Sequence, residues 1–89
     1  MTDLDRYKRE AAEHALLYVD SGMVVGLGSG STAYHMLVGL AERLHDGRLR
    51  DIVGVPTSEA TGQLARQLGI PITNLEEHPQ IELTLDGMP

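Results

Sequence analysis

Apolar residues recur every three or four positions in three segments of the chain, which is the spacing of an amphipathic helix. The stripes predict helices over residues 4–19, over roughly 32–46, and between a cap at Thr57 or Ser58 and a stop at Gly69. The stripe positions are Leu4, Tyr7, Ala11, Ala15 and Val19 in the first segment, Ala33, Met36, Leu37, Leu40 and Leu44 in the second, and Leu64, Ala65 and Leu68 in the third.

Short apolar runs between these segments are typical of strands. The predicted strands are residues 23–27, 52–55, 70–73 and 81–85, with a polar loop at 74–80 before the last. The order is helix, strand, helix, strand, helix, strand, strand, with connections long enough for crossovers. We therefore expect an α/β fold, namely a three-layer, Rossmann-like, mostly parallel sheet flanked by helices. Without repeats or linkers, residues 1–89 form a single domain.

The composition indicates which kinds of binding partner are unfavourable for this chain. The chain has 89 residues, a formal charge of -6 and no cysteine. An acidic chain is a poor general binder of nucleic acid or of a membrane surface, because clustered Lys and Arg hold phosphate backbones. With no signal peptide and no apolar run of about 20 residues, we expect a cytoplasmic protein.

A glycine-rich turn follows the first predicted strand. Residues 23–32 read MVVGLGSGST, in which Gly26, Gly28 and Gly30 permit tight turns and Ser31 or Thr32 can cap the next helix. Free N–H groups and the positive end of a helix dipole would point at whatever lies above such a turn. The pattern favours a phosphate cradle.

Three polar segments follow predicted strands: residues 28–32, Thr57-Ser58 and Asp86-Gly87. Ligands of open parallel sheets bind beyond the carboxyl ends of the strands, so these segments favour a phosphorylated small molecule. Spacing alone interprets Lys8 as part of a solvated face, with contact to a phosphate as its rival. For Asp86, a turn role competes with catalysis.

Two alternatives stay open for the glycine turn. Residues 28–33 satisfy the G-x-G-x-x-A form of a dinucleotide fingerprint, but residues 55–57 lack the acid that holds the ribose, and Asp51 lies at the other end of that strand. The turn can also serve packing alone. The four histidines have no metal-ligand spacing, so no metal site is expected.

Four motifs in order resemble the N-terminal part of ribose-5-phosphate isomerase type A. They are GLGSGSTA at 26–33, GVPTSEAT at 54–61, LGIP at 68–71 and LTLDG at 83–87, and the opening helix agrees through Lys8 and LLYV at 16–19. The resemblance implies interconversion of D-ribose 5-phosphate and D-ribulose 5-phosphate in the pentose phosphate pathway, through an enediol or enediolate. It implies no metal or other cofactor, and a homo-oligomer at full length.

The resemblance also implies roles for individual residues. Ser29, Gly30, Ser31 and Thr32 would hold the substrate, largely through its phosphate, with Lys8 adding charge. Asp86 would match the first Asp of the family's D-G-A-D-E segment, which contacts the sugar and assists ring opening and proton handling, with Gly87 beside it in the substrate site. Thr57 and Ser58 are secondary candidates at the same edge.

The resemblance breaks at the end of the chain, which reads Asp-Gly-Met-Pro at 86–89 where the family continues Asp-Gly-Ala-Asp-Glu. The family's glycine-rich segment with its lysine and its general-base glutamate come later still. We therefore expect a fragment of a longer isomerase that lacks the general base. A non-catalytic sugar-phosphate-sensing module is the alternative function.

Overall fold

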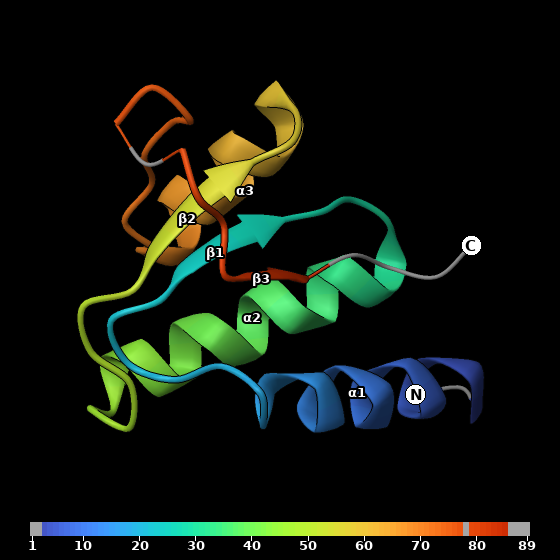
Figure 1. Cartoon of the computed structure of the whole chain (residues 1–89). Helices are drawn as coiled ribbons and strands as arrows, with labels where there is room; N and C mark the ends of the chain where they lie inside the picture. Colours follow the sequence, from blue (N-terminus) through green and yellow to red (C-terminus); the bar gives the residue numbers. More distant parts are fainter. Residues whose placement is uncertain (1–2, 78, 86–89) are drawn as a thin grey trace.

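The computed structural model describes residues 3–77 and 79–85 (Figure 1). Helices and strands alternate along most of the chain. The elements are α1 (Asp3–Leu16), β1 (Val24–Leu27), α2 (Ser31–His45), β2 (Val53–Pro56), α3 (Glu59–Leu68) and β3 (Leu83–Leu85). Apart from the loss of one strand, each predicted element is present with its ends shifted by a few residues.

The three strands form a parallel sheet in the order β2-β1-β3. Val25 of β1 lies in register with Gly54 of β2 and with Leu83 of β3. The last strand thus returns to the side of β1 that β2 does not occupy, which places β1 in the middle. The predicted α/β class with a parallel sheet flanked by helices is confirmed.

The strand predicted at residues 70–73 is wrong. Only an isolated parallel bridge joins Ile72 to Gly54. The Gly54 N–H donates to the Pro71 carbonyl at 2.8 Å, and the Thr73 N–H donates back to the Gly54 carbonyl at 2.8 Å. Pro71 has no N–H to extend the ladder, so pairing stops there. The last strand is also shorter than predicted. It begins at Leu83 and not at Ile81, which is exposed.

The predicted apolar stripe of the first helical segment is wrong in its N-terminal half, although Val19 is buried and Ala15 packs against the core as predicted. Leu4 and Tyr7 are 62% and 71% exposed, whereas Ala12 and Leu16 are the buried residues of α1. Both sets of positions have helical spacing, so the pattern alone could not choose between them. The helix ends at Leu16, not at Val19, because the next residues turn more tightly with i→i+3 bonds.

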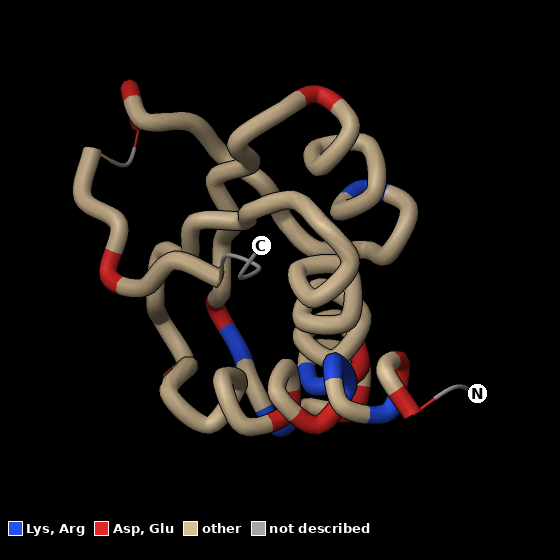
Figure 2. Tube along the Cα trace, turned by 90° about the vertical axis from the view of Figure 1, so that its right-hand side faces the viewer, with Lys and Arg blue, Asp and Glu red and all other residues tan. Residues whose placement is uncertain are grey.

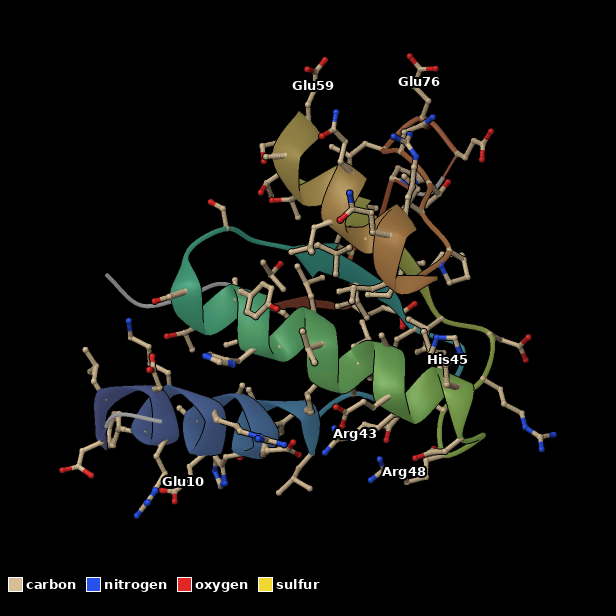
Figure 3. The ribbon with its side chains drawn as sticks, turned by 180° about the vertical axis from the view of Figure 1, so that it is seen from behind. Glu10, Arg43, His45, Arg48, Glu59 and Glu76 are labelled. Atoms are coloured by element: carbon tan, nitrogen blue, oxygen red, sulfur yellow. The ribbon has the colours of Figure 1, made fainter. Side chains whose placement is uncertain are left out.

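The core lies between the sheet and the helices. Its largest fully buried side chains come from β1, from α2 and from the residue just before β2: Val25, Leu27, Leu37, Leu40 and Ile52. Seen from behind, α2 and α3 lie in front of the strands and α1 runs alongside α2 (Figure 3). Charged residues gather along α1, near the N-terminus (Figure 2). Because α2 packs against β1 and follows it after a short turn, the N-terminus of α2 lies near the carboxyl end of the central strand.

Candidate functional site

The cradle is the turn of residues 28–32 between β1 and α2. Gly30 is the N-cap of α2, with φ 101° and ψ 171°, a conformation that only glycine adopts without strain. Ser31 and Thr32 are therefore not the cap, contrary to the prediction, and among the described residues no side chain caps this helix. The Tyr34 N–H donates to the Gly30 carbonyl at 2.9 Å. The N–H groups of Ser31 and Thr32 precede that bond and have no acceptor within the helix.

Lys8 lies at the cradle. Its Nζ donates to the Ser31 Oγ at 2.5 Å, joining α1 to the first turn of α2. The Lys8 residue is only partly exposed, whereas its neighbour Arg9 is exposed. The contact with Ser31 favours the rival interpretation, in which Lys8 reaches the cradle, over a purely solvated lysine. The positive charge of Lys8 thus stands beside N–H groups that have no acceptor within their own helix, an arrangement that favours an anion.

A cavity of ≈ 800 Å³ opens between α1 and the start of α2. It is lined by Leu4, Tyr7, Lys8, Ala11, Gly30, Ser31 and Thr32. One wall is the polar cradle, and the other is the apolar side of α1. Ser29, the remaining predicted cradle residue, is exposed beside it and is not part of that lining. Four of the predicted site residues, Lys8, Gly30, Ser31 and Thr32, thus share one cavity.

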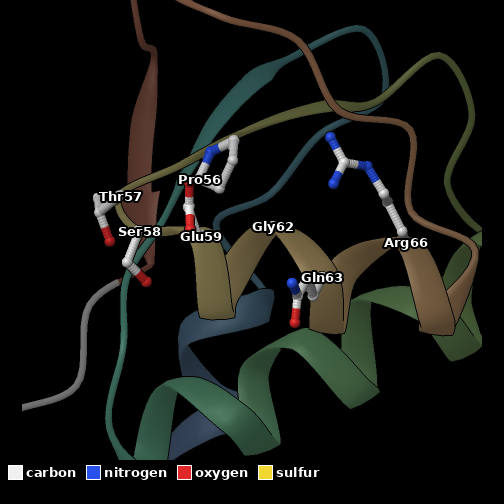
Figure 4. A pocket seen from close by; sticks show the side chains of 7 residues that line it. All are labelled: Pro56, Thr57, Ser58, Glu59, Gly62, Gln63 and Arg66. Carbon is white, nitrogen blue, oxygen red and sulfur yellow. The ribbon is translucent and has the colours of Figure 1, made fainter.

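The predicted secondary candidates Thr57 and Ser58 form hydrogen bonds that support the scaffold. The Thr57 Oγ1 donates to the Leu27 carbonyl at 3.0 Å, at the end of β1. Ser58 is the N-cap of α3 and accepts the Thr61 N–H at 3.2 Å, which confirms a predicted cap. The Ser58 hydroxyl thus caps the first turn of α3, and the Thr57 hydroxyl bonds the segment before α3 to the central strand β1. A separate cavity of ≈ 500 Å³ lies alongside them and extends to Gln63 and Arg66 (Figure 4).

Sequence reasoning missed Thr61, which is buried at 4% exposure. Its hydroxyl accepts from the Ser58 hydroxyl at 3.0 Å and donates to the Gly28 carbonyl at 3.5 Å. Thr61 therefore connects α3 to the first residue of the cradle. The spacing of Ser58 and Thr61 at the start of a predicted helix could have indicated their contact. Nothing in the sequence indicated that Thr61 also bonds to Gly28.

The predicted catalytic residue Asp86 and its neighbour Gly87 lie outside the described residues. What the structure does place is the end of β3, where the Leu85 carbonyl accepts the Gly28 N–H at 2.7 Å. Asp51, the acid nearest in sequence to a dinucleotide position, precedes β2 and lies at the opposite end of the sheet from the cradle. Asp51 is therefore not placed where an acid would hold a dinucleotide ribose.

Comparison with known proteins gives one consistent match. The chain is 65% identical over 81 residues to ribose-5-phosphate isomerase A of Roseiflexus castenholzii. The family model of ribose 5-phosphate isomerase A (phosphoriboisomerase A) matches residues 53–89. Over most of its own length, the chain is thus similar to part of a ribose-5-phosphate isomerase A. The resemblance predicted from the four motifs is confirmed.

Solved members of the isomerase family share the fold. A D-ribose-5-phosphate isomerase in complex with phospho-erythronic acid matches with a TM-score of 0.90 and 41% identity. The ribose 5-phosphate isomerase of Plasmodium falciparum matches with a TM-score of 0.90 and 45% identity. Each match covers 93% of this chain and 36% of the solved chain. The present chain spans 35% of the length of the Roseiflexus isomerase, covering 91% of its own.

Among the helices that the structure describes, none is both long enough and apolar enough to cross a membrane.

Proposed function

We propose that this chain is the sugar-phosphate-binding part of a ribose-5-phosphate isomerase, which as a whole interconverts D-ribose 5-phosphate and D-ribulose 5-phosphate. The observation that carries the proposal is the cradle, where an uncapped helix N-terminus meets the Nζ of Lys8. A phosphate group held there accepts from the N–H groups of Ser31 and Thr32 and is balanced by the ammonium of Lys8.

Side chains of the cradle add to this binding. The hydroxyls of Ser29, Ser31 and Thr32 can donate to phosphate or sugar oxygens, and Gly30 lets the backbone come close. The solved relative in complex with phospho-erythronic acid supports a phosphorylated ligand for this family. We assign the rest of the ligand to the cavity between the cradle and α1.

The chemical step needs a proton carrier between the two carbons of the enediolate. We propose Asp86, with Gly87 next to it, as the contact to the sugar that assists ring opening and proton handling. The general base belongs to a segment that the longer relatives carry. The proposal requires no metal and no other cofactor, and it extends to a cytoplasmic homo-oligomer for the longer protein.

A titration of the 89-residue chain with ribose 5-phosphate tests the binding part. Amide NMR signals of residues 29–32 should shift saturably, and inorganic phosphate should compete for the same signals. Lys8→Met should weaken binding about tenfold, the value of one charge-assisted hydrogen bond. Arg9→Met, which removes an exposed positive charge one position away, is the matched control and should leave the affinity within about twofold.

The result that contradicts the binding proposal is a folded chain whose cradle signals do not respond to ribose 5-phosphate. A coupled assay on a longer version, extended by the segment its relatives carry, tests turnover. Binding without turnover in that longer version would favour the sensing module instead.

A further inference from the structure

We infer that Arg43 and Glu13 are positioning residues that hold Lys8 at the cradle. The inference rests on the proposed function insofar as the cradle is taken to bind phosphate. Neither residue lines the cavity that contains the cradle. Both lie instead between α1 and α2, where the orientation of α1 is set.

Lys8 depends on the α1–α2 contact because α1 packs mainly against α2. Within α1 the buried residues are Ala12 and Leu16, both on the C-terminal side of Lys8. Lys8 lies two turns before Leu16, which is roughly 12 Å along the helix axis. A tilt of α1 by about 10° around Leu16 would therefore move Lys8 by about 2 Å. That displacement would break its 2.5 Å contact with Ser31.

Arg43 opposes such a tilt. Its Nη2 donates to the Glu13 Oε2 at 2.6 Å, and its Nη1 donates to the Gly39 carbonyl of its own helix at 3.1 Å. These two hydrogen bonds hold the guanidinium on both sides, and the Arg43 side chain is only 12% exposed. Arg43 lies on the side of α2 that faces α1 (Figure 3). The hydrogen bond from Arg43 lowers the pKa of Glu13, so the pair is charged at neutral pH.

Gly39 of α2 is a further contact point for α1. A Cβ at this position would stand 2.5 Å from the Leu16 Cδ1, so the absence of a side chain lets the two helices meet closely. The pivot is therefore at Leu16 and Gly39, and the Arg43–Glu13 pair is a second point of attachment. Two points fix the direction of a helix where one would leave it free to tilt. Lys8 extends from the part of α1 beyond both.

The first test reads the position of Lys8 without any ligand. In the 89-residue chain, the side-chain ammonium of Lys8 should give an NMR signal protected by its bond to Ser31. Arg43→Met should abolish that protection, and Arg43→Lys should restore part of it, because lysine keeps the ion pair with Glu13. Arg48→Met is the matched control. It removes the same charge from an exposed pair with Asp46 and should leave the Lys8 signal unchanged.

The second test measures the affinity for inorganic phosphate. Arg43→Met should weaken binding by about three- to tenfold in the wild-type background, and by less than about twofold when Lys8 is already methionine. Equal losses in both backgrounds, or an unchanged Lys8 signal in a folded Arg43→Met chain, would overturn the positioning role. If the Lys8 signal responds as expected but no variant binds phosphate, the positioning role is supported and the proposed function is the part that fails.

Discussion

Gly30 is the position at which backbone conformation and anion binding are most closely linked. Its φ of 101° with ψ of 171° lies in a region that is essentially restricted to glycine. A Cβ built there meets nothing within 4 Å, so Gly30→Ala introduces backbone strain without a steric clash. The strain amounts to about 1–3 kcal/mol. The variant either retains the turn and loses that much stability, or relaxes the turn and redirects the N–H groups of the cradle.

The affinity for phosphate should fall accordingly. If the turn relaxes, phosphate must restore it on binding, and a cost of about 1–3 kcal/mol corresponds to a loss of about 5- to 150-fold in affinity. Urea unfolding and phosphate titration of the same samples separate the two cases. Gly47→Ala is the control, because Gly47 also has a positive φ of 83° and open space around it but lies after α2.

The control variant should lose about 1–2 kcal/mol of stability and bind phosphate as the wild type does. The reasoning is refuted if Gly30→Ala matches the wild type in both stability and affinity. It is equally refuted if Gly47→Ala loses as much phosphate affinity as Gly30→Ala, because the effect would then come from general loosening of α2.

Substitutions at three positions test the scaffold. Gly39→Ala should destabilise the chain by about 1–3 kcal/mol in urea unfolding, because its Cβ would press on Leu16. Ser58→Ala should cost about 1 kcal/mol through loss of the α3 cap, while Ser58→Asn should be close to neutral by the same measurement. Because the pKa of Glu13 is lowered from its ordinary 4.5, its stabilising effect is present above that pH and is lost as pH falls through the folded pKa. Stability curves from pH 6 to pH 3 should therefore drop less steeply in Arg43→Met, by under about 1 kcal/mol for so exposed a carboxylate.

Local signals predicted much of this fold. The cap at Ser58 and the stop at Gly69 follow from side-chain chemistry within a single turn, and the structure has both, with Gly69 in the left-handed conformation. The parallel sheet followed from the alternation of helices and strands. Such features depend on residues that are neighbours in sequence, so they can be read without a structure.

The remaining features depend on tertiary packing. The buried face of α1 is selected by the close approach of Leu16 to Gly39, which no periodicity reveals. The contact of Lys8 with Ser31 joins two helices, and helical spacing favoured a solvated lysine over one that reaches the cradle. Gly30 is the N-cap of α2 because the turn requires a positive φ, although the sequence favoured Ser31 or Thr32 as the cap. In each case the decisive partner lies on another element or in the backbone itself.

The bond between the Gly28 N–H and the Leu85 carbonyl has a consequence for how the molecule is made. It joins the beginning of the cradle to Leu85, so the segment up to Leu85 must have emerged from the ribosome before this bond can form. Pairings of that sequence separation form slowly. The nascent protein should therefore form its helices before it completes its ligand-binding turn. A single cut by a protease in the exposed segment at residues 74–77 would separate the two partners in sequence and make that final step a bimolecular one.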